Sequence, residues 1–200
     1  MLRLIGNQFK RPTGFLGKII SKIMIKGNSQ DYDKIIPELE IKRNDRILEI
    51  GYGHGLGVNR ISTHYDCHIT GIDFSELMFK EATKRNKIYI ENKKVELNFG
   101  NFLAFEIGSD QFDKVFCVHV IYFWDILADP LAKINTVLKE GGAFCLFMAK
   151  TDYLKTMKFT KDGIFNKYSL DQVVDELRRA GFRDISHITN DKGYIIKCKK

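Results

Sequence analysis

Short apolar runs alternate along the chain with segments whose apolar residues recur at helical spacing. The run that contains Ile47, Leu48 and Ile50 is typical of a strand covered on both faces. The strands predicted in this way are 46–50, 67–73, 94–99, 112–119 and 142–148, followed by a hairpin made of 183–188 and 193–199. Together with the helices between them, these strands favour a single α/β domain.

Polar residues and glycines predict where the intervening helices begin and end. A first helix is predicted at 56–63, after a glycine-rich turn. The predicted N-caps are Ser75, Asp129 before Pro130, and Ser169, which forms a capping box with Gln172. Two helices are predicted to end at Gly141 and Gly181. The polar, basic segment 150–167 has no clear period, and is expected to be either a substrate-binding insertion or a plain surface connection.

The first forty residues predict two helices. Six apolar residues recur at helical spacing: Phe15, Leu16, Ile19, Ile20, Ile23 and Met24. On another face, lysines stand four residues apart at Lys18, Lys22 and Lys26. This basic amphipathic helix is predicted to end near Gly27, and a second helix is predicted at 31–39, with Pro37 near its end. The first is interpreted as a lid over the substrate end of the domain; contact with anionic lipid or nucleic acid is the alternative.

Composition and charge narrow the classes of protein. The chain has 200 residues, of which 44% are hydrophobic, enough for one domain with a substantial core. The net charge is +7, and residues 1–30 contain basic but no acidic side chains. No apolar run approaches the roughly 20 residues of a membrane span, and lysines interrupt the N-terminal apolar residues, unlike a signal peptide. The expected location is therefore cytoplasmic.

Cysteine spacing gives no indication of a metal site or a disulfide. Cys67, Cys117, Cys145 and Cys198 each lie in an apolar segment, without a C-x-x-C pair or a histidine at metal-binding spacing. They are predicted to be buried free thiols.

The most informative stretch follows the first predicted strand and reads Glu49-x-Gly51-x-Gly53-x-Gly55. Alternating glycines let a ligand lie against bare backbone at the start of a helix. A dinucleotide-binding loop would continue as G-x-G-x-x-G, but Leu56 stands at the last position, and the phosphate-binding loop with Lys and Ser or Thr is also missing. A carboxylate two residues before the first glycine disfavours a pyrophosphate and could hold a cation or hydroxyl groups.

This pattern resembles motif I of the class I S-adenosylmethionine-dependent methyltransferases, in particular the methyltransferase-11/25 type of small-molecule enzyme. The resemblance extends over 46–200 and includes Leu138-Lys139-Glu140-Gly141-Gly142 before the fifth strand, where the family often has L-K-P-G-G. It implies a Rossmann-like, doubly wound sheet of seven strands, mostly parallel with a C-terminal antiparallel hairpin, helices on both faces and N-terminal cap helices. The implied parts are cap helices (1–40), a cofactor-binding core (45–148), a substrate segment (149–168) and a C-terminal helix with the hairpin (169–200).

The resemblance also implies a cofactor site for S-adenosylmethionine, with S-adenosylhomocysteine as product. Asp73, at the end of the second strand, is suited to accept hydrogen bonds from two ribose hydroxyls. Asn101 stands where the family often has an acidic residue that binds the adenine amino group. The residues expected to bind the cofactor are Glu49, Gly51, Tyr52, Gly53, Gly55, Asp73, Phe74, Met78, Asn101, Phe102 and His119.

The expected reaction is in-line transfer of the methyl group to an oxygen, nitrogen or carbon atom of a small molecule. Because the sulfonium cofactor is already electrophilic, no dedicated catalytic signature is required; His54, His119 and Tyr122 are candidate proton acceptors by position only. The alternatives are an RNA or other nucleic-acid methyltransferase that uses the basic N-terminal segment, a cofactor-binding protein without turnover, and an enzyme that acts on lipid at a membrane surface. The proline-containing motif of amino-methylases that flip a base is missing after the fourth strand.

Overall fold

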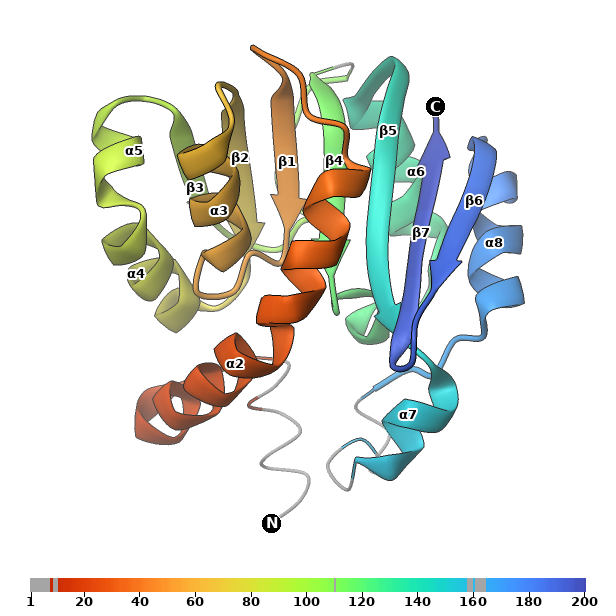
Figure 1. Cartoon of the computed structure of the whole chain (residues 1–200), viewed down its shortest axis with the longest axis horizontal. Helices are drawn as coiled ribbons and strands as arrows, with labels where there is room; N and C mark the ends of the chain where they lie inside the picture. The colour runs from red at the N-terminus through yellow and green to blue at the C-terminus, as the bar shows by residue number, and fades with distance from the viewer. Residues whose placement is uncertain (1–7, 9–10, 110, 158–159, 161–164) are drawn as a thin grey trace.

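The computed structural model describes residues 8, 11–109, 111–157, 160 and 165–200. For residues 15–16 and 18–26, which lie within these ranges, it describes the backbone but not the side chains. Seven strands form one sheet in the order β3-β2-β1-β4-β5-β7-β6 (Figure 1). Their bounds are β1 (Arg46–Ile50), β2 (His68–Asp73), β3 (Val95–Phe99), β4 (Phe112–Val118), β5 (Leu138–Ala149), β6 (Arg183–Thr189) and β7 (Gly193–Lys199). The first five strands are parallel, and β7 runs antiparallel to both β5 and β6. The predicted fold class is confirmed.

Helices cover both faces of the sheet because successive strand residues point to opposite sides. Ile47 of β1 packs in one core with α2 (Gly14–Glu38) and α3 (Leu56–His64), whereas Leu48 and Ile50 pack in a second core with α6 (Ala128–Val137) and α8 (Leu170–Arg179). The remaining helices are α4 (Glu76–Arg85), α5 (Lys87–Glu91), the short 3-10 helix η1 (Ile121–Phe123) and α7 (Thr151–Thr156). Figure 1 places α7 and the first half of α2 beyond the edge where β1 and β2 end.

The prediction of two separate N-terminal helices is wrong. One helix, α2, runs from Gly14 to Glu38 and passes through Gly27. A glycine inside a helix costs only about 1 kcal/mol, which packing of the helix on the sheet offsets. Pro37 lies in the last turn, where the helix is about to end. The amphipathic side chains expected to form a lid face are mostly among those that the structure does not describe.

The predicted helix ends are confirmed in part. Ser75 accepts a hydrogen bond from the Met78 amide, and Ser169 forms the predicted capping box with Gln172. Asp129, however, lies in the first turn of α6 rather than at its N-cap, which is Leu127.

The helix α6 also ends earlier than predicted. It stops at Val137, before Gly141, because Leu138 already pairs with Phe112 in the sheet.

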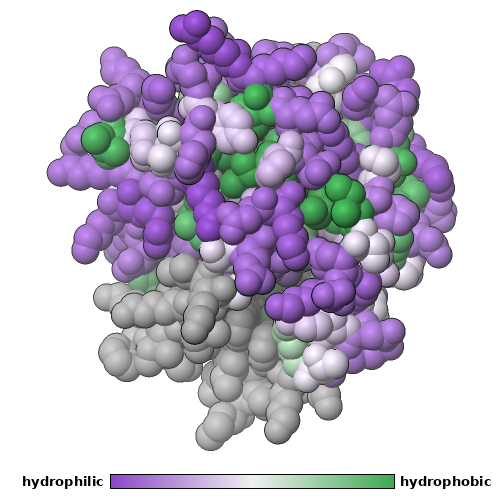
Figure 2. Space-filling view, in the orientation of Figure 1, coloured by the Kyte–Doolittle hydropathy of each residue, from purple (hydrophilic) through white to green (hydrophobic). Residues whose placement is uncertain are grey.

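Two further expectations concern the surface and the thiols. The four cysteines are buried and free, as predicted. Among the described residues, none of the helices is both long and apolar enough to cross a membrane. The described part of the face that carries α2 is largely hydrophilic, with apolar side chains in small separate patches (Figure 2).

Of the segment 150–167, residues 158–159 and 161–164 lie outside the described part of the chain.

Candidate functional site

A cavity of about 280 Å³ opens where β1, β2 and β4 end. In an open parallel sheet this edge is where ligands bind, because the loops after neighbouring strands diverge there. Nine of the eleven residues predicted to bind a cofactor line this first cavity: Gly51, Tyr52, Gly53, Asp73, Phe74, Met78, Asn101, Phe102 and His119. Glu49 and Gly55 do not line it.

The glycine loop has the left-handed backbone that its sequence predicts. Gly51 has φ +71°, and a Cβ atom on it would lie 2.4 Å from Cγ2 of Val120, so a side chain would collide with the neighbouring loop. Gly53 has φ +53°, and no protein atom lies within 4 Å of its virtual Cβ. The bare backbone of Gly53 therefore faces open space in the wall of the first cavity.

Asp73 is held by the two turns that meet at the cavity. Its Oδ2 accepts a hydrogen bond from the Gly53 amide at 2.9 Å, and its Oδ1 accepts one from the Ser75 amide at 2.8 Å. Burial raises the pKa of this carboxyl to about 6, against the opposing effect of the two amides. The carboxylate keeps free lone pairs on both oxygens, so it can still accept hydrogen bonds from a ligand.

Part of the lining of the first cavity is apolar. Phe74, Met78 and Phe102 line it, and Met78 and Phe102 are buried. Asn101 also lines the cavity, but its Oδ1 accepts a hydrogen bond from the Leu103 amide at 3.0 Å. The side-chain oxygen of Asn101 is thus already engaged within its own turn, although a second lone pair remains.

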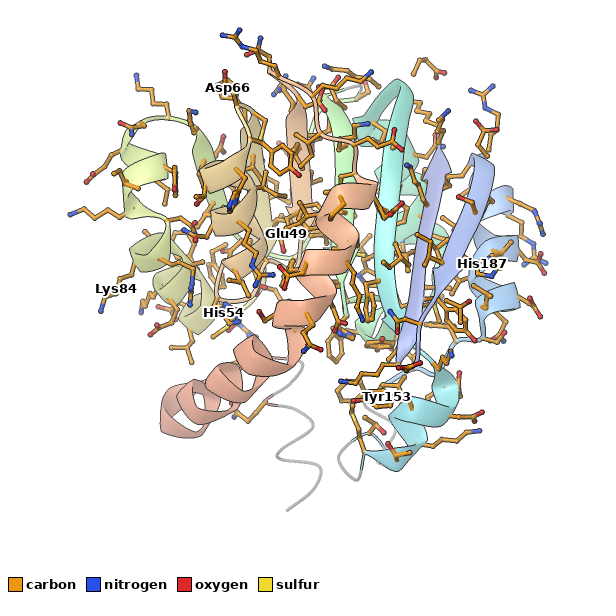
Figure 3. The ribbon with its side chains drawn as sticks, viewed as in Figure 1. Glu49, His54, Asp66, Lys84, Tyr153 and His187 are labelled. Carbon is orange, nitrogen blue, oxygen red and sulfur yellow. The ribbon has the colours of Figure 1, made fainter. Side chains whose placement is uncertain are left out.

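Glu49 lies behind the cavity, between β1 and α2 (Figure 3). Its side chain is fully buried, and its Oε1 accepts a hydrogen bond of 2.8 Å from the hydroxyl of Tyr32. Burial raises the pKa of Glu49 to about 8, so that the carboxyl is protonated at neutral pH. Tyr32 does line the first cavity, so its hydroxyl connects Glu49 to that cavity.

Gly55 is required for packing rather than for space in the cavity. A Cβ atom at this position would lie 2.5 Å from Nδ2 of Asn86 and 2.8 Å from Cβ of Ala82. Gly55 therefore permits α3 to begin directly against α4.

His54 lines the first cavity but is a poor base there. Burial of its ring and, to a smaller extent, the charge of the nearby Arg85 lower its pKa to about 4. The Nδ1 atom has no hydrogen-bond partner among the described residues. His54 is consequently neutral at physiological pH.

A second cavity of about 300 Å³ adjoins the first. It lies among α2, η1, the end of β5 and α7, and Asn28, His119 and Phe123 line both cavities. Its other described walls are mostly apolar, with Tyr122 from η1 and Leu154 from α7 among them. The boundary between the cavities is therefore formed by a histidine, an amide and an aromatic ring.

His119 occupies this boundary with both ring nitrogens engaged. Its Nε2 lies 2.9 Å from Oδ2 of Asp31, and its Nδ1 lies 3.2 Å from the hydroxyl of Tyr122. The residue has φ +59°, a conformation that is uncommon outside glycine. The structure thus brings together the predicted candidates His119 and Tyr122, and adds Asp31, which the sequence did not single out.

The helix α2 supplies the residues that sequence reasoning missed. Asn28, Asp31 and Tyr32 occupy positions i, i+3 and i+4, hence one face of the helix, and all three line the cavities. That spacing of polar residues was the only available signal, and splitting the helix at Gly27 concealed it. Arg60 of α3 holds this face in place through Asp33, at 2.8 Å, and the carbonyl of Ser29, at 2.6 Å.

Comparisons with known proteins agree with this geometry. A family model described as a methyltransferase domain matches residues 47–142. The uncharacterized methyltransferase YdaC of Bacillus subtilis (strain 168) is 30% identical over 168 residues, which cover 84% of this chain and 87% of that protein. The sterol 24-C-methyltransferase of Kluyveromyces lactis is 27% identical over 157 residues, but these cover 71% of this chain and 41% of the sterol enzyme.

Solved structures show the same fold. The phosphoethanolamine N-methyltransferase 2 of Haemonchus contortus, in complex with phosphomonomethylethanolamine and S-adenosylhomocysteine, superposes with a TM-score of 0.73 at 16% identity. The match covers 86% of this chain and 52% of that one. The glycine loop and the strand-end aspartate agree with the family model and with the relative that is 30% identical over most of the chain. The chain therefore belongs to the class I S-adenosylmethionine-dependent methyltransferases, and S-adenosylmethionine is its cofactor.

Proposed function

We propose that the protein transfers the methyl group of S-adenosylmethionine, bound in the first cavity, to a small molecule bound in the second. The observation that carries this proposal is the shared wall: Asn28, His119 and Phe123 line both cavities. A methyl donor and an acceptor must approach end to end for in-line displacement, and two adjoining cavities provide that arrangement.

The residues around the first cavity fit the cofactor. Asp73 offers carboxylate lone pairs to the ribose hydroxyls, and the open space over Gly53 admits the methionine part against bare backbone. Phe74, Met78 and Phe102 form an apolar wall suited to adenine. When bound, the cofactor supplies an electrophilic methyl group on a sulfonium. The work left to the protein is to hold the acceptor in line with that methyl and to exclude water.

The second cavity supports a small acceptor. Its volume of about 300 Å³ is at the lower end of the range for small-molecule sites. Its described walls are mainly aromatic and aliphatic, with a few polar groups gathered at the boundary with the first cavity. Tyr153, on α7, lies beyond the end of β5 and the start of β7 and lines this cavity (Figure 3).

Calorimetric titration with S-adenosylhomocysteine tests the cofactor site. Replacing Asp73→Asn retains the shape of the side chain but removes its charge, and hydrogen bonds to charged groups contribute about 1.5–3 kcal/mol. We therefore expect a loss of about 10- to 100-fold in affinity. Asp66→Asn is the matched control, because Asp66 lies at the opposite edge of the sheet (Figure 3) and is paired with Arg43 and Lys94 at the surface.

Equal affinities of the parent protein and Asp73→Asn would contradict the assignment of the ribose to Asp73. Transfer itself is tested by incubating the protein with methyl-tritiated S-adenosylmethionine and a whole-cell extract that contains metabolites and nucleic acid, then separating labelled small molecules from protein and nucleic acid. Label recovered only in nucleic acid would contradict a small-molecule acceptor, and the absence of any labelled product would contradict turnover.

A further inference from the structure

A hydrogen-bonded chain of three side chains, Asp31, His119 and Tyr122, lines the second cavity, and His119 also lines the first. Asp31 can only accept at its carboxylate, so the 2.9 Å contact assigns the proton to Nε2 of His119. In the neutral imidazole, Nδ1 is then an acceptor, and its partner at 3.2 Å is the hydroxyl of Tyr122. The hydroxyl of Tyr122 therefore donates to His119, and His119 donates to Asp31.

The hydroxyl oxygen of Tyr122 has one position left for a ligand. A tyrosine oxygen carries one proton and accepts up to two hydrogen bonds. Its proton is directed to His119, and one acceptor position is filled by the backbone amide of Ala149. Tyr122 is 2% exposed and lines the second cavity, and we assign the remaining acceptor position to a proton donor bound there.

The environment holds this chain in one geometry. The side chain of Asp31 is 10% exposed and that of His119 is 23% exposed, so the pair is shielded but the imidazole retains a route to solvent. The edge of the His119 ring packs on Phe147, with ring centroids 4.8 Å apart. The left-handed backbone of His119 persists because these contacts determine it, and such strain is characteristic of functional positions.

This arrangement discriminates between acceptor atoms. A neutral amine attacks the methyl group through its own lone pair and can lose a proton to water afterwards. A neutral hydroxyl is a weak nucleophile and needs its proton removed as the new bond forms. A buried hydrogen-bonded chain of side chains that ends on a carboxylate can take up the proton that a hydroxyl acceptor loses, whereas an amine acceptor does not need it.

The walls of the second cavity indicate the rest of the acceptor. Phe123, Phe147, Leu154 and Phe165 surround the space next to Tyr122. Among the described residues of this cavity, the side chains of Asp31 and Lys192 carry charge at neutral pH, and Asp31 is engaged with His119. An apolar ring system fits these walls better than a phosphorylated or zwitterionic molecule does.

We propose that the acceptor is an apolar molecule bearing a hydroxyl group, and that Tyr122 removes the proton of this hydroxyl with the help of His119 and Asp31. The proposal rests on the proposed function and names its substrate class. The acceptor oxygen forms a bond to the methyl carbon, while the bond from that carbon to sulfur breaks and its electron pair stays on sulfur.

The proton follows the hydrogen-bond chain. It passes from the acceptor to Tyr122, as the tyrosine proton moves to Nδ1 of His119. The imidazolium is paired with Asp31 until it releases a proton to solvent. Tyr122 is the catalytic residue, and His119 and Asp31 act through it.

The test uses the full chain with 1-naphthol and 1-naphthylamine, two probes with the same ring body and different attacking atoms. Calorimetry measures binding of 1-naphthol to protein saturated with S-adenosylhomocysteine, and transfer is measured with methyl-tritiated S-adenosylmethionine. We expect 1-naphthol to bind and to be methylated. Tyr122→Phe should lower kcat on 1-naphthol by about 100-fold, the usual contribution of a general base, with KM within about threefold of the parent.

Further variants separate a proton-transfer role from a structural one. His119→Asn keeps a residue that tolerates the left-handed backbone and should lower kcat to a similar extent. Asp31→Asn can still accept from His119 but loses the charge, so we expect a decrease of about 10-fold. Tyr122 and Asp31 do not line the first cavity, so in Tyr122→Phe and Asp31→Asn the affinity for S-adenosylhomocysteine should remain near the parent value. Tyr65→Phe, which removes a hydroxyl at the C-cap of α3 from a residue that lines neither cavity, is the matched control.

Three results would overturn the inference. The first is that 1-naphthol fails to bind to a protein that does bind S-adenosylhomocysteine, which leaves the proposed function standing. The second is that neither Tyr122→Phe nor His119→Asn lowers kcat on 1-naphthol. The third is equal loss on 1-naphthol and 1-naphthylamine, which identifies a positional rather than a proton-accepting role. A parent protein that does not bind S-adenosylhomocysteine refutes the proposed function itself.

Discussion

The buried carboxyl of Glu49 should make the stability of the protein decrease with pH near neutrality. In the folded chain its pKa is about 8, raised by burial, compared with 4.5 for an ordinary glutamate. Between these values the native state retains a proton that the unfolded chain has lost. The free energy of unfolding therefore falls as pH rises through this window, and levels off above about pH 8.

The window from about pH 6.5 to 8 isolates this effect, because Asp73 and His54 titrate lower, with pKa values of about 6 and 4. Burial raises the pKa of Tyr32, Tyr52 and Tyr122 far above the window. Each pH unit corresponds to about 1.4 kcal/mol for one proton. The parent protein should accordingly lose about 2 kcal/mol of unfolding free energy across this window.

Glu49→Gln removes the titrating group while retaining an oxygen for the Tyr32 hydroxyl. We expect the decrease with pH to disappear in this variant, whatever its absolute stability. Urea unfolding at several pH values, followed by the fluorescence of Trp124, the single tryptophan, provides the measurement. Glu81→Gln, which changes an exposed glutamate of α4, should behave like the parent. Identical slopes for the parent and Glu49→Gln would show that Glu49 is ionised in the native state and refute the reasoning.

Two further predictions concern the glycine loop and the anchoring of α2. Gly53 and Gly141 both have a left-handed backbone and open surroundings, so replacing either by alanine should cost about 1–2 kcal/mol of stability. Only Gly53→Ala should weaken binding of S-adenosylhomocysteine in calorimetry; equal affinities of the two variants would contradict a ligand over Gly53. Arg60→Ala removes the contacts to Asp33 and Ser29. Partly exposed charged contacts contribute about 1 kcal/mol, so amide hydrogen exchange in α2 should become about fivefold faster; unchanged exchange would show that packing alone holds the helix.

Local sequence determined the sheet and the glycine loop. The run around Ile47 and Leu48 predicted β1, because a strand buried on both faces needs apolar residues on both. The glycines predicted positive φ at Gly51 and Gly53 because other residues are strained there. Asp73 was predicted from its place at the end of β2, and the structure brings it to the cavity. These features depend on the conformation of a few consecutive residues, which can be predicted directly from the types of those residues.

Tertiary structure decided how distant segments meet. The sequence assigned Glu49 to the cofactor by resemblance; packing of α2 on β1 buries Glu49 against Tyr32, and it is Tyr32 that lines the cavity. The sequence could not place Asp31 beside His119, because the contact joins segments 88 residues apart and depends on α2 continuing through Gly27. Periodicity describes which face of a helix is apolar, whereas only the assembled core determines what that face contacts, and it is this assembly that creates the second cavity.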